Sequence, residues 1–310
     1  MSSPKFILVA FAAVIVKVCQ SDVAVANDRI QSRFLGTLNR YYVSSRDLLA
    51  DGIDYIDLAN SDAAVSQLQV LHGVENVAIV IHGRESNAFS DFGIKLRESF
   101  INSDDNLVVI LVDWPIISSM DYATIVNSVP YVADDIITLI GRLESFGKIN
   151  RRLVHILGFD VGAHIAGLVS RDSNARVQRI TGLSPAGASW VGNPRCLRST
   201  DADYVEVIHT NYGGLGINEL IGTVDFFANS GNDQPGCTDN QCSHDRAWEL
   251  FAAALDMDGH LMGLKCDDFN AVVNKECKSG PALALGTNDL YKEGSGIYRV
   301  NTGDEYPYNA

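Results

Sequence analysis

Short, nearly continuous apolar runs alternate along most of this chain with segments in which apolar residues have helical spacing. The apolar runs predict strands at residues 77–81, 107–112, 153–157, 179–183 and 204–209. The helical spacing predicts helices at residues 89–102, 122–146, 161–170 and 247–255, the second of them interrupted near Pro130. Strands that are apolar throughout are typical of sheets buried on both faces. The pattern therefore predicts an α/β fold with a mostly parallel central sheet and helices on both faces.

Two flanking segments extend this pattern. Residues 29–57 mix short aromatic and polar runs, which predicts an edge hairpin or capping strands, and residues 296–300 read as a final strand. No internal repeat, linker or low-complexity tract divides the chain, so we expect a single domain over residues 27–310. In such sheets ligands bind at the carboxyl ends of the strands.

The N-terminus is typical of a secretory signal peptide. Lys5 is a minimal charged region, residues 6–16 are apolar, and small residues follow at Ala24-Val25-Ala26, with Ser21 as another cleavage point. The apolar run is too short to span a bilayer, and no other uninterrupted apolar run reaches about 18 residues. We expect a signal peptide at residues 1–26 and a secreted, extracellular protein without a transmembrane segment.

Net charge limits the classes of binding partner, and the cysteines indicate the redox state of the compartment. A formal net charge of −14 argues against nucleic acid and against electrostatic docking on anionic membranes, since both require Lys/Arg clusters. Of the six cysteines, Cys19 leaves with the signal peptide. The close spacings of the others suggest the disulfides Cys237–Cys242 and Cys266–Cys277 in an oxidising compartment. Cys196 is then left as a buried free thiol or as the site of an intermolecular bridge.

Residues 153–164 carry the most specific motif. An apolar strand runs into Gly158-Phe159-Asp160-Val161-Gly162, and a small-residue helix start follows. This G-x-D-x-G has the layout of the nucleophile elbow of α/β hydrolases, in which a serine occupies the central position of a sharp strand-to-helix turn. A carboxylate cannot form an acyl-enzyme that water resolves as it does a serine ester. The motif predicts a hydrolase scaffold without its attacking hydroxyl.

Further motifs follow in a fixed order over nearly the whole chain. They are Ile81-His82-Gly83, Val112-Asp113-Trp114, Ile180-Thr181-Gly182-Leu183-Ser184-Pro185-Ala186, Val207-Ile208-His209-Thr210, Asp225-Phe226, Gln234-Pro235-Gly236-Cys237 and Cys242-Ser243-His244-Asp245-Arg246-Ala247. In this order and spacing they resemble the secreted pancreatic-type lipase family, including its insect phospholipase A1-like branch. The resemblance implies the α/β-hydrolase fold. The C-terminal β-sandwich domain of vertebrate members has no counterpart in this sequence, so we expect none.

The resemblance also assigns site positions. The family has serine, aspartate and histidine where this chain has Asp160, Ser184 and His244, so two of the three triad positions are substituted. The backbone N–H groups of Arg84 and Val161 match the oxyanion-hole donors. A calcium-associated aspartate of relatives corresponds to Asp201, but the accompanying glutamate is not found and the remaining histidines lack metal-ligand spacing. We therefore expect no metal and no cofactor.

Asp160 allows two interpretations once ordinary lipase chemistry is set aside. In the structural one, it tolerates a positive φ, caps the following helix and forms an ion pair with the His244 ring. In the catalytic one, it attacks carbon as the elbow aspartate does in epoxide hydrolases and haloalkane dehalogenases, and His244 then activates water. Asn211, after the next strand, is an amide and supplies no acid for that histidine.

Only residues 238–241 separate Cys237 from Cys242, where the resemblance implies a disulfide-closed lid over the active site. So short a loop leaves open any acyl groove lined by segments such as 215–221. The leading hypothesis is a secreted, catalytically inactive lipase-like protein that binds a lipid or acyl ligand, or a partner, through a remnant cleft. The alternatives are an active carboxylic ester, phospholipid or Asp-nucleophile hydrolase, and a yolk-like storage protein. The oligomeric state is left open.

Overall fold

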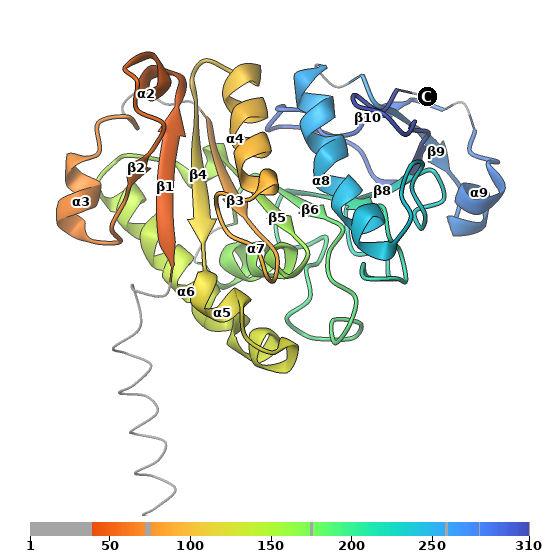
Figure 1. The fold of residues 1–310 in the computed structure, drawn as a ribbon, viewed down its shortest axis with the longest axis horizontal. Coiled ribbons are helices and arrows are strands. Elements are labelled where there is room, and N and C mark those ends of the chain that lie inside the picture. Colours follow the sequence, from red (N-terminus) through yellow and green to blue (C-terminus); the bar gives the residue numbers. More distant parts are fainter. Residues whose placement is uncertain (1–38, 72–75, 174–175, 258–259, 279, 310) are drawn as a thin grey trace, which may run out of the picture.

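A computed structural model describes residues 39–71, 76–173, 176–257, 260–278 and 280–309 (Figure 1). The expected signal peptide at residues 1–26 lies outside these ranges. Within them, eleven strands form one mixed sheet in the order β10-β9-β11-β8-β7-β6-β5-β3-β4-β1-β2. The strands are β1 (Arg40–Ser45), β2 (Ile56–Asp57), β3 (Asn76–Ile81), β4 (Leu107–Asp113), β5 (Val154–Phe159), β6 (Arg179–Leu183), β7 (Tyr204–His209), β8 (Val224–Ala228), β9 (Met262–Cys266), β10 (Leu283–Ala284) and β11 (Gly296–Val300).

The centre of the sheet is parallel and both edges are antiparallel. Every neighbouring pair from β4 through β3, β5, β6, β7 and β8 to β11 runs parallel. At one edge β1 pairs antiparallel with β4 and with β2, and at the other β9 pairs antiparallel with β11 and β10. The predicted mostly parallel sheet is confirmed. Of the segment 29–57, expected to form an edge hairpin or capping strands, the described part forms the antiparallel edge strands β1 and β2.

Helices cover both faces of the sheet. They are α2 (Arg46–Ala50), α3 (Asp62–Gln67), α4 (Asp91–Ser103), α5 (Pro115–Ser118), α6 (Tyr122–Ser145), α7 (Val161–Asp172), α8 (Asn240–Asp256) and α9 (Phe269–Asn274), with a 3₁₀ turn at Arg151–Leu153. Successive strand residues point to opposite faces, so Ile79 packs in a core with α6 and α7, and Val80 packs in a second core with α4 and α8. Figure 1 shows α4 and α8 on the near side of the sheet.

Several elements differ from the sequence prediction. Helix α6 runs without interruption through Pro130, because proline removes only one backbone hydrogen bond while the neighbouring Val129 and Ala133 are fully buried. Helix α8 begins at Asn240 rather than at residue 247, because Asp239 caps it by accepting a bond from the Cys242 N–H (2.8 Å). The first turn of α8 is polar, so no apolar periodicity in the sequence indicates that the helix begins there. Strands β8, β9 and β10 and the short helices α2, α3, α5 and α9 were not predicted.

Helix α6 is also long and apolar enough to cross a membrane by length and composition alone, and it is the one such helix among the described residues. Half of its apolar window is buried inside the fold. Its apolar face packs into the core that it shares with α7, which accounts for this composition.

Candidate functional site

Asp160 occupies the sharp turn between β5 and α7. Its backbone has φ 54° and ψ −121°, a conformation that L-residues rarely adopt. The flanking glycines permit this turn: a Cβ on Gly158 would lie 2.3 Å from the Gly162 carbonyl oxygen, and a Cβ on Gly162 would lie 2.4 Å from the carbonyl oxygen of Ile81. The two glycines of the motif are therefore required by close backbone approach, and the expected positive φ of Asp160 is confirmed.

The buried carboxylate of Asp160 contacts two segments from elsewhere in the chain. Its Oδ1 lies 3.3 Å from His244 Nε2, so the carboxylate is within salt-bridge reach of this ring, as expected. Its Oδ2 accepts a hydrogen bond from the backbone N–H of Arg84 (3.1 Å) and lies 3.8 Å from the Arg84 Nε. The expected capping of α7 is wrong, since the side chain makes no cap hydrogen bond. The carboxylate is held by Arg84 and His244 instead.

Ser184 contacts the other nitrogen of the same histidine ring. Its Oγ lies 2.9 Å from His244 Nδ1, and the side chain is buried at the carboxyl end of β6. A hydroxyl proton donated to Nδ1 leaves the Nε2–H facing Asp160. The structure thus brings together a carboxylate, an imidazole and a hydroxyl, the three groups of a Ser-His-Asp triad, with the carboxylate and the hydroxyl exchanged.

Asp160 is ionised at neutral pH. Burial alone raises the pKa of a carboxyl group, but the His244 ring, the Arg84 N–H and the Arg84 guanidinium together hold the pKa of Asp160 below its ordinary value. The negative charge also acts on Tyr122, whose ring lies under the Arg84 guanidinium at 5.4 Å. Burial and the Asp160 charge raise the pKa of Tyr122 to about 12, so this phenol stays neutral.

The segment that carries Arg84 is fixed by packing. The His82 ring stacks on Trp114, its Nε2 accepts the Trp114 backbone N–H (3.1 Å), and its Nδ1 is 2.7 Å from the Gly83 carbonyl oxygen. A Cβ on Gly83 would lie 2.7 Å from the Cβ of Asp160. His82 and Gly83 therefore form the tight turn that places the Arg84 N–H against the Asp160 carboxylate.

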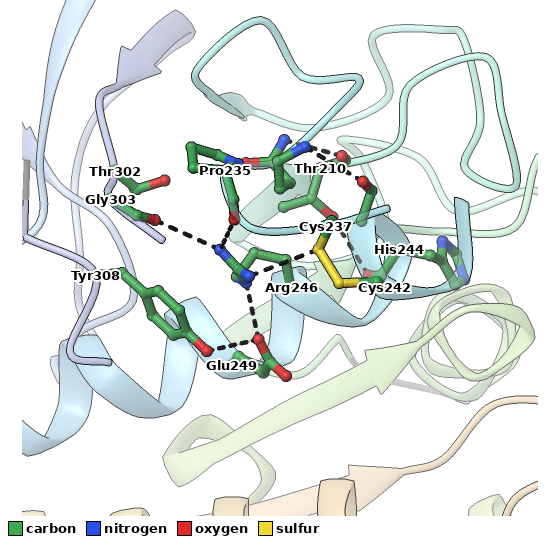
Figure 2. A network of polar contacts seen from close by, with 12 residues as sticks. Thr210, Pro235, Cys237, Cys242, His244, Arg246, Glu249, Thr302, Gly303 and Tyr308 are labelled. Atoms are coloured by element: carbon green, nitrogen blue, oxygen red, sulfur yellow. Dashed lines mark hydrogen bonds and ion pairs between the residues drawn. A yellow bond between two sulfur atoms is a disulfide. The ribbon is translucent and has the colours of Figure 1, made fainter. Parts of the chain in front are cut away.

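The first turns of α8 place His244, and Arg246 anchors them. Arg246 donates to the Pro235 carbonyl oxygen (3.0 Å), to Glu249 Oε2 (2.8 Å) and to Cys237 Sγ (3.5 Å), as Figure 2 shows. Cys237 also closes the short disulfide loop with Cys242 at the start of α8. The helix that carries the imidazole is thereby tied to the loop before it.

A cavity of about 410 Å³ lies against Asp160 and His244. Its wall includes the aromatic rings of Phe92, Phe159 and Trp248 and the carboxylates of Glu85, Asp91 and Asp245, and Arg84, Ser86, Ser90 and Gln241 complete it. Segment 215–221, expected to line an acyl groove, does not line this cavity, and its Ile217 is buried in the core with α6 and α7. The space beside the triad positions is mixed aromatic and acidic.

Sequence reasoning missed Phe92, Asp245 and Trp248 as parts of this wall. Knowing that α8 begins at Asn240 would have revealed them. A helix from that residue places His244 and Trp248 one turn apart on the same face. Because the helix was predicted from residue 247 onward, His244 lay outside it, and its spacing from Trp248 did not indicate a shared helix face.

The remaining candidate residues have structural surroundings. Cys237–Cys242 and Cys266–Cys277 are disulfides as expected, and Cys196 is a free buried thiol whose pKa burial raises to about 12. Asp201 pairs with Arg171 (2.7 Å). Val161 is the buried first residue of α7. The described residues contain no group of three or more His, Cys, Asp or Glu side chains suited to a metal ion.

The Asn211 side chain holds a neighbouring loop. Its Oδ1 accepts the Leu215 N–H (2.6 Å), and its amide nitrogen contacts Asn240 Oδ1 (3.2 Å). Ser184 occupies the position in contact with His244 Nδ1, and none of the carboxylates that the structure describes contacts this side of the imidazole.

Comparisons with known proteins agree on one family. The family model described as Lipase matches residues 50–289. Lipase member H-B of Xenopus laevis is 37% identical over 213 residues, 65% of this chain and 46% of that protein. Phospholipase A1 member A of Rattus norvegicus is 35% identical over 233 residues, 71% of this chain and 49% of that protein. The chain spans about half the length of these curated relatives.

Among solved structures, MGS-M1, an α/β-hydrolase enzyme from a Medee basin deep-sea metagenome library, matches with a TM-score of 0.37 and 15% identity, covering 53% of this chain and 64% of that one. The family model covers most of the chain, from before β2 to beyond β10. The parallel sheet with its sharp β5–α7 turn is the α/β-hydrolase architecture. The chain belongs to the lipase family.

Proposed function

We propose that this protein is a secreted, catalytically silent member of the lipase family that binds a lipid or acyl ligand, or a partner protein, through the cavity beside Asp160. One observation carries the proposal: a buried, ionised carboxylate stands at the nucleophile position and contacts both His244 Nε2 and the Arg84 N–H. These are the base and an oxyanion donor that ester cleavage would require.

Ester cleavage needs a hydroxyl that faces the substrate and gives its proton to histidine. The hydroxyl on this histidine belongs to Ser184, which is buried and does not line the cavity. A Cβ on Gly216 would approach Ser184 Oγ to 2.9 Å, so the backbone closes over this side chain. Ser184 therefore cannot replace the missing nucleophile.

The alternative with Asp160 as a nucleophile is less well supported by the same contacts. Attack on carbon needs a free carboxylate oxygen, and both oxygens of Asp160 are engaged by His244 and Arg84. Activation of water by His244 also needs an acid on its second nitrogen to stabilise imidazolium. That nitrogen contacts the neutral Ser184 hydroxyl.

Turnover tests this proposal directly. The purified wild-type protein, with His244→Ala as control, is incubated with p-nitrophenyl butyrate, phosphatidylcholine and an aryl epoxide. We expect the same background rate from both proteins. Wild-type turnover that His244→Ala abolishes would overturn the proposal, and turnover confined to the epoxide would assign Asp160 as the nucleophile.

The double variant Asp160→Ser, Ser184→Asp tests why the protein is silent. It restores a hydroxyl opposite Nε2, frees the Arg84 N–H and places a carboxylate at Nδ1, so we expect ester hydrolysis at least about 10²-fold above wild type. Each single variant serves as a control. A folded double variant without activity would contradict the claim that these two positions account for the silence.

Secretion is the second part of the proposal. Two disulfides support an oxidising compartment, and the expected signal peptide supports export. When the full chain is expressed in a eukaryotic cell line, we expect the processed protein in the medium. Retention in the cytosol with reduced cysteines would contradict it.

A further inference from the structure

We infer that the cavity beside Asp160 binds the ammonium head of an amino alcohol, either free or as the headgroup of a lipid. This inference rests on the proposed function and names the ligand class of the same site. It follows from the charge balance of the cavity, from its aromatic wall and from one buried ring nitrogen.

The charge balance favours a cation. The Arg84 guanidinium is committed to Asp160 at 3.8 Å and to the face of Tyr122. Three further carboxylates line the cavity, those of Glu85, Asp91 and Asp245, and within the described part of the chain none of them forms an ion pair. A fatty-acid carboxylate entering this space meets three negative charges that no basic side chain neutralises. Asp245 accepts a hydrogen bond from Gln241 (2.9 Å), and Asp91 lies in the first turn of α4, where the helix dipole favours a negative charge. It also finds the Arg84 N–H already occupied by Asp160.

Aromatic rings supply the surface that an organic ammonium requires. The Phe92 ring lies between two others, 5.5 Å from Phe159 and 6.3 Å from Trp248, measured between centroids. The Phe92 and Trp248 planes are nearly perpendicular, at 89°. Phe92 and Phe159 are buried in the core, and Trp248 is the partly buried ring of the three. An alkylated ammonium beside these rings is attracted to aromatic faces and carries apolar methyl or methylene groups.

His244 gives an independent indication of a ligand atom. Its Nε2 is buried in a side chain that lines the cavity, yet it makes no hydrogen bond of acceptable geometry with any described residue. The nearest acceptor, Asp160 Oδ1, lies 3.3 Å away, and this contact is too poorly directed to satisfy the N–H fully. A ligand oxygen on the cavity side would satisfy this donor. The ligand class is therefore an ammonium with an oxygen a few bonds away.

Calorimetric titration of the intact protein tests the inference with matched probes. Choline is compared with 3,3-dimethylbutan-1-ol, in which a neutral carbon replaces the ammonium nitrogen, and with hexanoate as the anionic probe. We expect choline to bind about tenfold more tightly than its neutral isostere and hexanoate not to bind. Equal affinity for choline and the isostere, or preferred binding of hexanoate, would overturn the inference.

Variants locate the binding within this cavity. Asp245→Asn removes a charge but keeps the shape of a side chain that Gln241 contacts (2.9 Å), and Trp248→Leu removes a ring from the wall. Both should weaken choline binding about fivefold or more. Glu98→Gln removes the same charge from the exposed side of α4, outside the cavity, and should leave the affinity unchanged. Choline affinity that follows net charge alone, so that all charge variants behave alike, contradicts the assignment.

The two proposals fail in different ways. Ester turnover with choline binding intact overturns the silent function alone, whereas no turnover and no choline binding overturns this inference alone. Sedimentation with vesicles then separates the sources. Pelleting with phosphatidylcholine but not with phosphatidylglycerol assigns a lipid headgroup. Choline binding without pelleting assigns a free amino alcohol.

Discussion

The Asp160 carboxylate joins two segments that are far apart in the chain. It accepts the Arg84 N–H of the turn after β3 and pairs with His244 on α8, while its own backbone occupies a strained conformation. Such conformations persist only when the surroundings hold them. The sequence analysis expected the contact with His244 but not the one with Arg84. Together the two contacts make Asp160 a buried link between β3, β5 and α8.

Asp160→Asn tests the energetic value of this charge. The folded-state pKa of Asp160 lies below that of the unfolded chain, so its contribution is fully present above pH of about 4 and is lost as pH falls through the folded value. We expect the variant to be less stable than wild type by about 1–3 kcal/mol at pH 7. Urea unfolding of both proteins at pH 7 and pH 3 measures the difference. A gap that is as large at pH 3 would show that the carboxylate charge is not its source.

The β5–α7 turn depends on glycines at two positions, and its helical neighbour α6 offers a matched control. A Cβ on Gly162 would meet the backbone oxygens of Ile81 and His82 at 2.4 and 2.6 Å, whereas a Cβ on Gly141 within α6 would meet nothing within 4 Å. The same chemical change is therefore forbidden at one position and accommodated at the other.

Gly162→Ala and Gly141→Ala should shift stability in opposite directions. We expect Gly162→Ala to cost about 1–3 kcal/mol or more, because backbone atoms must move. Gly141→Ala should add about 0.5–1 kcal/mol, because alanine restricts the unfolded chain and favours helix. Thermal unfolding of the two variants beside wild type measures both effects. Similar changes at the two sites would contradict the close approach at the turn.

Sequence patterns predict an element well when the burial of that element determines which of its positions are apolar. Strands β3 to β7 are buried and mostly apolar because both faces are covered, and the G-x-D-x-G motif follows from backbone contacts at one turn. The start of α8 could not be found this way, because Asp239 determines it through a cap rather than through apolar spacing. The cavity wall was missed for the same reason.

The contacts of Asp160 were predictable only in part. The contact with His244 follows from two motifs that the fold brings together. The bond from the Arg84 N–H depends on how a buried carboxylate rotates among competing donors, which no linear pattern encodes.

At the scale of the whole molecule, a second buried polar cluster lies away from the cavity. Arg179 at the start of β6 pairs with Glu206 of β7 (3.0 Å), and Lys292, in the segment between β10 and β11, also pairs with Glu206. Arg179 further donates to the carbonyl oxygens of Thr287 and Asp289 (both 2.7 Å). This cluster fastens the segment before β11 to the sheet.

Lys292 gives the fold a pH dependence at the alkaline end. Burial lowers its pKa to about 8 despite the opposing charge of Glu206, and Arg179 lowers it further. Between pH of about 8 and 10.4 the unfolded chain binds more protons at this residue, so its contribution to stability rises with pH. Relative to Lys292→Met, wild type should gain stability between pH 7 and pH 10, measured by urea unfolding. A constant difference would contradict the lowered pKa.

Because Asp160 and Ser184 contact opposite nitrogens of one imidazole, a substitution at either position changes the balance of charge around the whole ring. Asp160→Ser alone would place the ring between two alcohols, and Ser184→Asp alone would place it between two buried acids that repel each other. Only a simultaneous change at both positions keeps one carboxylate and one hydroxyl on the imidazole, so these two positions have to be engineered as a unit.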